Sequence, residues 1–273
     1  MKTGFQWAAG VLLFWTLLVL PSANSLAADN EESAKLLHFL ETEYTPSTPL
    51  LPAGATVKEG LFEPGEGQPV GAVQLVKGAV LVLHKDNNKT AFKLQKDSPL
   101  FPGDTLITEK GSRVTLLMQD NSVLTLTAQS KLVLDRAVYN PDQGRRDTKL
   151  QLLLGRMRAI VSKLAGKTSF TVKTPTALAG VRGTDFALAV APAPEAPSQL
   201  MTAVLTGGGR SFVEVTSPTG GAGTVLCPQS VLRADEGGKI GKPIRVCWRA
   251  GKLMRRVAPE IGLNCNFFYT PKK

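Results

Sequence analysis

The chain of 273 residues has little of what a catalytic or metal site needs. It contains only two histidines, His38 in a predicted helix and His84 at a predicted strand end, without metal-ligand spacing between them. An ordinary surface or interface position is favoured for each. There is no Gly-x-Ser-x-Gly elbow and no P-loop. We therefore expect a protein that is not an enzyme and has no metal and no cofactor, with a secreted hydrolase as the least favoured alternative.

Acidic residues are also scarce. The chain has 22 Asp and Glu against 32 Lys and Arg, a formal net charge of +10 at pH 7. In an exported protein this balance points to anionic envelope polymers, a membrane surface or acidic partners rather than nucleic acid, and plain solubility explains it equally well. Arg145, Arg146 and Lys149 form a basic cluster at a loop exit, for which a solvated loop is the default and partner contact the alternative.

Long apolar runs are limited to one, the thirteen residues from Ala8 to Leu20. It follows Lys2 and precedes small residues up to Ala27, which is the order of a secretory signal peptide over residues 1–27. The run is short for a membrane span of about twenty residues, and an uncleaved anchor is the alternative. We expect an exported protein, periplasmic or secreted after cleavage near Ala27.

The three cysteines, Cys227, Cys247 and Cys265, lie near the C-terminus. In an oxidising compartment a pair is expected, with one thiol left over. Cys227 and Cys247 each lie ten residues from Gly237, so a hairpin centred there could bring them together. Cys227 and Cys247 are therefore the candidate disulfide, although nearby prolines disfavour the hairpin.

Three flanking segments are predicted. Residues 28–44 read as a short amphipathic helix capped by Asp29 or Asn30, and residues 45–70 are a Pro/Gly-rich linker or strap. Residues 246–273 form a basic C-terminal helix and tail. For both helices, packing on the domain is favoured over binding to a partner or a membrane. The apolar face of the first helix would be Leu36, Leu37, Leu40 and Tyr44.

Between these flanks the pattern is one of short strands with turn residues every eight to twelve positions. This spacing predicts an all-β fold of many short antiparallel strands, as a sandwich, barrel or solenoid-like roll. Residues 191–199, rich in Pro and Ala, are expected to form an exposed stiff loop. The predicted strands are 72–77, 79–84, 91–95, 105–109, 113–118, 122–127, 131–138, 148–154, 157–162, 170–174, 185–190, 201–205, 211–216, 224–227 and 229–234.

The stretch from Val172 to Val190 organises the chain. Pro175 suits the end of one strand, and alternating apolar residues from Asp185 onward predict the next. Between them we expect an irregular turn in which Thr184 and Asp185 bond to backbone groups, as we expect also for Asp104 and Asp120 in their turns. Arg182 would lock this corner through its guanidinium, or else project toward a partner.

At these residues the sequence resembles the FecR domain family. Phe170-x-Val172-x-Thr174-Pro175 followed by Val181-Arg182-Gly183-Thr184-x-Phe186 looks like its signature. Three further motifs agree in the same order over about half the chain: Gly103-Asp104-x-Leu106-x-Thr108, the hairpin Gly111-Ser112-Arg113-Val114 with Asp120-Asn121-Ser122, and Gly155-Arg156-Met157-Arg158.

The resemblance implies an all-β extracytoplasmic domain, here over residues 71–245, best known as the periplasmic half of anti-sigma regulators that answer TonB-dependent receptors. Those regulators have a cytoplasmic helical segment and a membrane span before the domain, whereas about seven residues precede the apolar run here. We therefore expect a stand-alone FecR-domain protein that does not control a sigma factor by itself.

The expected function is a non-enzymatic binding or sensory module that recognises a protein partner in envelope signalling or assembly. The alternative is an envelope-associated structural or carbohydrate-binding protein with peptidoglycan as its ligand. The candidate partner-binding residues are Arg182, Thr184, Asp185, Arg145 and Arg146.

Overall fold

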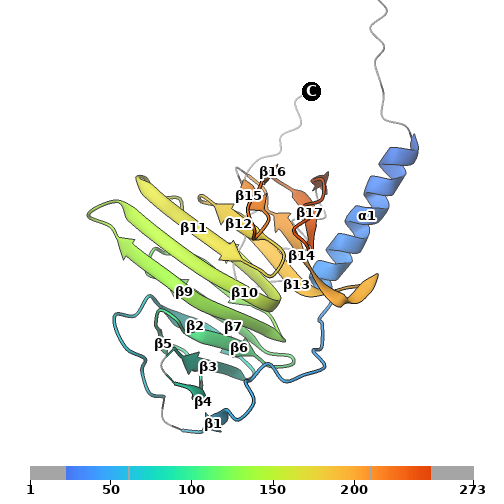
Figure 1. Cartoon of the computed structure of the whole chain (residues 1–273). Coiled ribbons are helices and arrows are strands. Elements are labelled where there is room, and N and C mark those ends of the chain that lie inside the picture. Colours follow the sequence, from blue (N-terminus) through green and yellow to red (C-terminus); the bar gives the residue numbers. More distant parts are fainter. Residues whose placement is uncertain (1–22, 61, 86, 210, 247–273) are drawn as a thin grey trace, which may run out of the picture.

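The computed structural model describes residues 23–60, 62–85, 87–209 and 211–246 (Figure 1). The predicted apolar run from Ala8 to Leu20, Cys247, Cys265 and the predicted C-terminal helix lie outside these ranges. The described chain begins with one helix, α1 (Ala23–Glu41), and continues with strands only. The strands are β1 (Thr56–Lys58), β2 (Gly71–Lys77), β3 (Val80–His84), β4 (Asn87–Lys93), β5 (Pro99–Leu100), β6 (Thr105–Thr108), β7 (Arg113–Met118), β8 (Val123–Leu126), β9 (Ser130–Asn140), β10 (Arg145–Ile160), β11 (Lys167–Lys173), β12 (Leu178–Val181), β13 (Asp185–Ala193), β14 (Ala196–Thr206), β15 (Val213–Thr216), β16 (Thr224–Leu226), β17 (Ser230–Asp235) and β18 (Ile244–Arg245).

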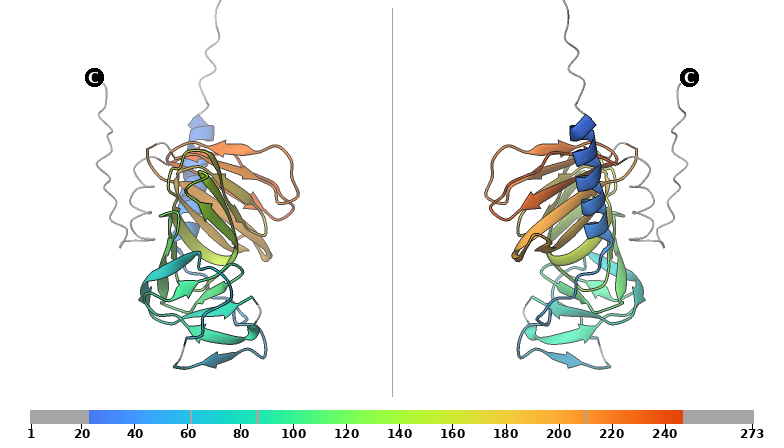
Figure 2. Two further views of the ribbon diagram at one scale, coloured as in Figure 1. Left: turned by 90° about the vertical axis from the view of Figure 1, so that its left-hand side faces the viewer. Right: turned by 90° about the vertical axis from the view of Figure 1, so that its right-hand side faces the viewer.

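Hydrogen bonds arrange the strands in two ladders that lie face to face (Figures 1 and 2). The first ladder has the order β1-β4-β3-β6-β9-β10-β11-β12-β15-β16. The second has the order β5-β2-β7-β8-β10-β13-β14-β17-β18. The all-β prediction is confirmed, with one correction: β1–β4 and β10–β11 are parallel pairs.

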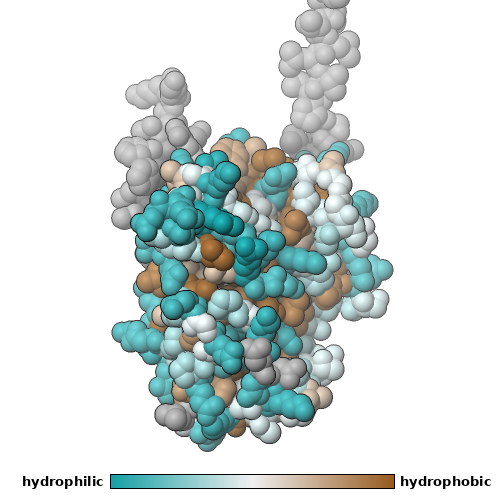
Figure 3. Space-filling model, turned by 60° about the vertical axis from the view of Figure 1, so that its left-hand side comes forward, coloured by the Kyte–Doolittle hydropathy of each residue, from teal (hydrophilic) through white to brown (hydrophobic). Residues whose placement is uncertain are grey.

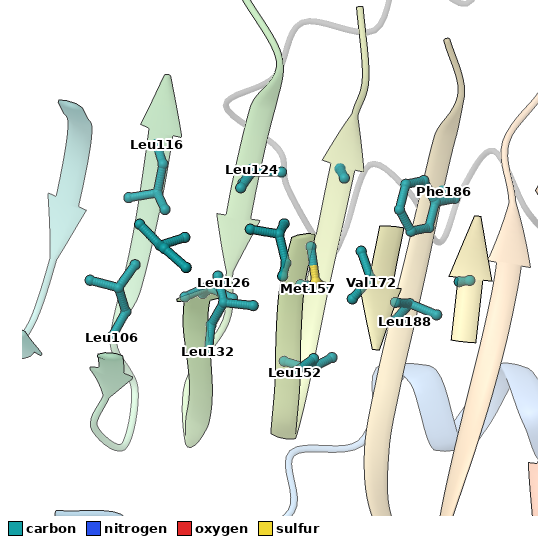
Figure 4. Close-up of a cluster of buried hydrophobic side chains, with 14 of the residues drawn as sticks. Leu106, Leu116, Leu124, Leu126, Leu132, Leu152, Met157, Val172, Phe186 and Leu188 are labelled. Atoms are coloured by element: carbon teal, nitrogen blue, oxygen red, sulfur yellow. The ribbon is translucent and has the colours of Figure 1, made fainter. Parts of the chain in front are cut away.

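One apolar core fills the space between the ladders from end to end (Figure 4). Alternate residues of each strand point into it, because successive side chains of a strand face opposite sides. The first ladder contributes Leu106, Leu132, Leu152 and Val172, and the second contributes Leu116, Leu124, Met157, Phe186 and Leu188.

The long strand β10 joins the two ladders. Its residues 145–154 pair in the first ladder and Gly155–Ile160 pair in the second. The predicted break at Gly155 is wrong: the strand bends there without ending. Gly155 has φ of +88°, and a Cβ at this position would lie closer than 3.0 Å to Ser130 and to the carbonyl oxygen of Gln129. Only glycine accommodates that conformation and that approach.

Two other local predictions need correction. The irregular turn expected after Pro175 contains β12, whose Leu178–Val181 pair with β11 and β15. The loop expected at 191–199 is a hairpin, because β13 runs to Ala193 and β14 starts at Ala196. A shift in register beside Pro192 accommodates the proline.

Helix α1 packs on the outer face of the second ladder. It begins at Ala23, before the predicted cap at Asp29 or Asn30, and ends before Tyr44. The described helix is not long and apolar enough to cross a membrane. Arg156 donates from Nη1 to the carbonyl oxygens of Leu40 (3.4 Å) and Glu41, a cation at the negative end of the helix. The helix contributes Leu36, Leu37 and Leu40 to an apolar cluster with Ala187, Ala189, Met201, Ala203, Leu205, Val231 and Ile244.

Residues 45–70 run as a strap along the first ladder (Figure 1). Within the strap, β1 pairs with β4, and Lys131 donates from Nζ to the Leu50 carbonyl oxygen at 3.1 Å. The apolar side chains of the strap, Leu50, Leu51 and Ala55, pack against Leu81, Leu83, Ala91 and Ile107.

Cys227 is an exposed thiol that forms no disulfide with another described residue, and its predicted partner Cys247 lies outside the described residues. The pairing of β17 with β18 places Ser230 opposite Arg245, whereas a hairpin that sets Cys227 opposite Cys247 would place Ser230 opposite Ile244. The Cys227–Cys247 disulfide stays a prediction.

Candidate binding surface

The corner after β11 is held by buried threonine hydroxyls. Thr174 donates its backbone N–H to the Ala177 carbonyl oxygen at 2.8 Å, and its Oγ1 accepts the Ala177 N–H at 2.9 Å. The hydroxyls of Thr174 and Thr176 lie 2.8 and 2.6 Å from that of Thr202 on β14. All three threonines are buried, so this network fixes the corner from inside.

Asp185 is bound by an arginine that the sequence argument did not single out. Arg158, whose side chain is fully buried, donates from Nε to Oδ1 (2.9 Å) and from Nη2 to Oδ2 (2.8 Å) of Asp185. This bidentate ion pair joins β10 to the start of β13. Asp185 therefore has a structural role here, which corrects its assignment to partner contact. The signal was present, because Arg158 ends the Gly-Arg-Met-Arg motif.

The other two residues of this turn behave differently from one another. Thr184 is 2% exposed and donates its hydroxyl to the Phe212 carbonyl oxygen at 3.0 Å, so it cannot contact a partner. Arg182 is exposed, and within the described chain it shows no hydrogen bond or ion pair. The predicted lock by Arg182 is wrong, since Arg158 holds the corner. Contact between Arg182 and a partner stays a prediction.

The neighbours Arg145 and Arg146 point to opposite faces of β10. Arg145 is exposed, whereas Arg146 is 1% exposed and lies in the core. Arg146 Nη1 donates to Asp120 Oδ2 (3.0 Å) and to the Ser162 carbonyl oxygen (2.8 Å), and its guanidinium lies 5.7 Å from the Phe170 ring centre. Partner binding by Arg146 is thus contradicted by its burial. Asp120 also accepts the Ser122 N–H, the turn bond expected of it.

His84 is a buried histidine, not a surface one. Its Nδ1 lies 2.7 Å from Asp104 Oδ1, and its Nε2 lies 2.8 Å from the Glu63 carbonyl oxygen in the strap. A carboxylate and a carbonyl both accept, so both contacts are hydrogen bonds only when the ring is protonated, and the geometry therefore favours the imidazolium form. The hydrogen bond that His84 donates to Asp104 raises the pKa of His84 against the opposing effect of burial. Asp104 also accepts the Phe101 N–H at 2.8 Å, as its turn position predicts.

The described residues contain no group of three or more His, Cys, Asp or Glu side chains that could hold a metal. Three ionisable pairs lie in the interior, Arg158–Asp185, Arg146–Asp120 and His84–Asp104. Each pair is formed within the protein, although Nε and Nη2 of Arg146 have no hydrogen-bond partner among the described residues. What the domain offers to other molecules is therefore its outer surface, where Arg145 and Arg182 remain exposed.

Comparisons with known proteins found one family model and several similar solved structures. A family model described as FecR protein matches residues 104–208, from the turn before β6 to just past β14. Two crystal structures of a candidate anti-sigma factor from Parabacteroides distasonis are similar, each at 20% identity and a TM-score of 0.40, covering 52% of this chain. The similarity covers 59% of the length of that protein.

A third solved structure, a cell surface anchoring domain, shares 25% identity over 24% of this chain and 83% of its own, with a TM-score of 0.22. A search of curated proteins gave no match. The FecR match covers the central strands of both ladders and the Val172–Val190 corner. Through residues 104–208, the chain is similar to the FecR family.

Proposed function

We propose that this protein is an exported, non-enzymatic sensory or binding module that recognises a protein partner in envelope signalling or assembly. The observation that carries the proposal is the FecR match over a β-fold in which the motif residues stabilise the domain itself. Arg158, Asp185 and Thr184 all form hydrogen bonds within the protein. A rigid scaffold with exposed faces suits recognition, because little conformational entropy is lost on binding. The leader at residues 1–27 would direct it to the periplasm or outside the cell.

The test is affinity capture of the full chain from envelope extract, with captured proteins identified by mass spectrometry and peptidoglycan fragments assayed in parallel. The proposal expects one saturable protein partner that untagged chain displaces. Recovery of wall polymer alone, released by salt, would reject it.

That second outcome defines the alternative function, an envelope-associated protein held on peptidoglycan or another anionic polymer. The observation that favours it is the excess of exposed lysine and arginine on the first ladder, including Arg145, Lys149 and Lys173. Salt would release such a complex, because screening weakens charge-driven adhesion.

A further inference from the structure

The outer face of β10, β11 and β12 carries a series of exposed cations in register. The parallel pairing of β10 with β11 sets Arg145 beside Lys167 and Lys149 beside Thr171, and Lys173 lies beside Gln151. Arg182 comes directly after Val181, which pairs with Phe170, so it lies near the end of β11 at which Lys167 is found. We call the five residues Arg145, Lys149, Lys167, Lys173 and Arg182 the basic track.

The five cations of the basic track are not paired with acidic side chains of the described chain. None of the five forms an ion pair with another described residue, and the stretch 148–184 contains no Asp or Glu. Asp147, the acid on the same face of β10, is occupied by Arg136 at 3.1 Å. Glu214 on β15 lies beyond Gly180 and bounds the face on that side. The track therefore presents cations that an external anion can neutralise.

The shape of the track is long, narrow and low. Lys167 and Lys173 lie six residues apart on one strand, a distance of about 20 Å, while neighbouring strands lie about 4.8 Å apart. Between the cations the surface is formed by Ser169, Thr171 and Gly180, all small. Figure 3 shows hydrophilic side chains gathered over the upper part of the molecule on this side. An extended chain can lie close to the sheet surface between the cations, because the side chains there are small.

One end of the track has an exposed aromatic residue. Phe212 is 49% exposed, and its carbonyl oxygen accepts the Thr184 hydroxyl, which holds it beside the Arg182 turn. Val181 pairs with Val213, so Arg182 and Phe212 are the next residues outward from that pair. A ligand bound along the basic track would therefore contact cations over most of its length and the apolar ring of Phe212 at one end.

We propose that the basic track binds an extended acidic segment of a partner protein, with an apolar side chain of that segment packed on Phe212. The proposal rests on the proposed function, because it presumes a protein partner. Charge complementarity favours an anionic ligand, and Phe212 favours a peptide over a purely polar glycan. The elongated strip of cations, about 20 Å along the strands, favours a linear chain over a planar membrane.

The experiment measures fluorescence anisotropy of a labelled ten-residue peptide in which Glu alternates with Ser and one end carries Leu, titrated with the full chain at low salt. A peptide with Gln in place of Glu is the ligand control. The double variant Lys149→Glu/Lys173→Glu should weaken binding by about tenfold, since two attractive charges become repulsive. Phe212→Ser should weaken binding of this peptide but not of a peptide lacking Leu.

The matched protein control is Lys77→Glu/Lys96→Glu, which makes the same change in net charge at two exposed lysines away from the track. It should change affinity less than about twofold. Equal losses in the two double variants, or no binding by the wild-type chain, would overturn the proposal. So would track-dependent binding to phosphatidylglycerol vesicles or heparin without peptide binding. If the track variant still captures the envelope partner, this inference fails while the proposed function stands.

Discussion

At the scale of single residues, the arginines of β10 and the following corner divide by the face of the strand they occupy. Arg146 and Arg158 lie inside the protein and bind Asp120 and Asp185, whereas Arg145 and Arg182 face solvent. A buried charge that loses its partner is costly, while an exposed one is not. The two buried arginines therefore stabilise the fold, and the two exposed arginines are the ones that can contact a partner.

This division predicts opposite results for two matched substitutions. Arg158→Met removes both hydrogen bonds to Asp185 and should lower the free energy of unfolding by ~3 kcal/mol. Arg182→Met should change it by less than about 0.5 kcal/mol. Urea denaturation followed by circular dichroism measures both. Equal effects of the two substitutions would contradict the assignment of the corner's lock to Arg158.

The raised pKa of His84 predicts a pH dependence of stability. Because the folded state binds this proton more tightly than the unfolded chain, its stabilising effect is complete below the ordinary pKa of about 6.5. It is lost as pH rises through the higher pKa of the folded state. Melting temperatures across this window should fall for the wild type and stay level for His84→Gln. His38→Gln, at an exposed position, should keep the wild-type fall; a fall retained in His84→Gln would refute the assignment.

At the scale of elements, the sequence predicted what short-range patterns encode. Alternation and turn residues placed β7, β8 and β13 well, since each strand carries its own signal. β12 was missed because Leu178–Val181 is short and one of its two partners, β15, lies far along the chain. Arg146 was misassigned because β10 begins at Arg145, three residues before its predicted start, so the two-residue period already applies there.

The bend in β10 gives a prediction about an element. Gly155→Ala would place a methyl group against Ser130 and force a non-glycine residue to φ of +88°. The free energy of unfolding should fall by about 3 kcal/mol or more, the sum of strain and overpacking. Gly111→Ala is the matched control, because Gly111 has φ of +67° but no atom near the added Cβ, so only about 1 kcal/mol is expected. Similar losses in both would mean that close packing at the bend is unimportant.

At the scale of the whole molecule, one core extends through strands on both sides of the segment that matches the family model. Val73, Val80 and Phe92 precede residues 104–208, and Val213 and Leu232 follow them, yet all five lie in the same apolar cluster. Strand pairing also crosses the limits of the matched segment, because β7 pairs with β2 and β14 pairs with β17. The cooperative unit is therefore larger than the matched segment.

This arrangement predicts that a fragment of residues 104–208 does not fold alone. It would expose the apolar face that β2, β3 and β17 cover and would leave the edges of β7 and β14 unpaired. We expect no cooperative thermal transition and strong binding of a hydrophobic dye, whereas residues 23–246 should melt in one transition. Near-ultraviolet circular dichroism and calorimetry distinguish the two. A cooperative transition in the short fragment would show that the central strands form an independent domain and that the flanking strands are additions to it.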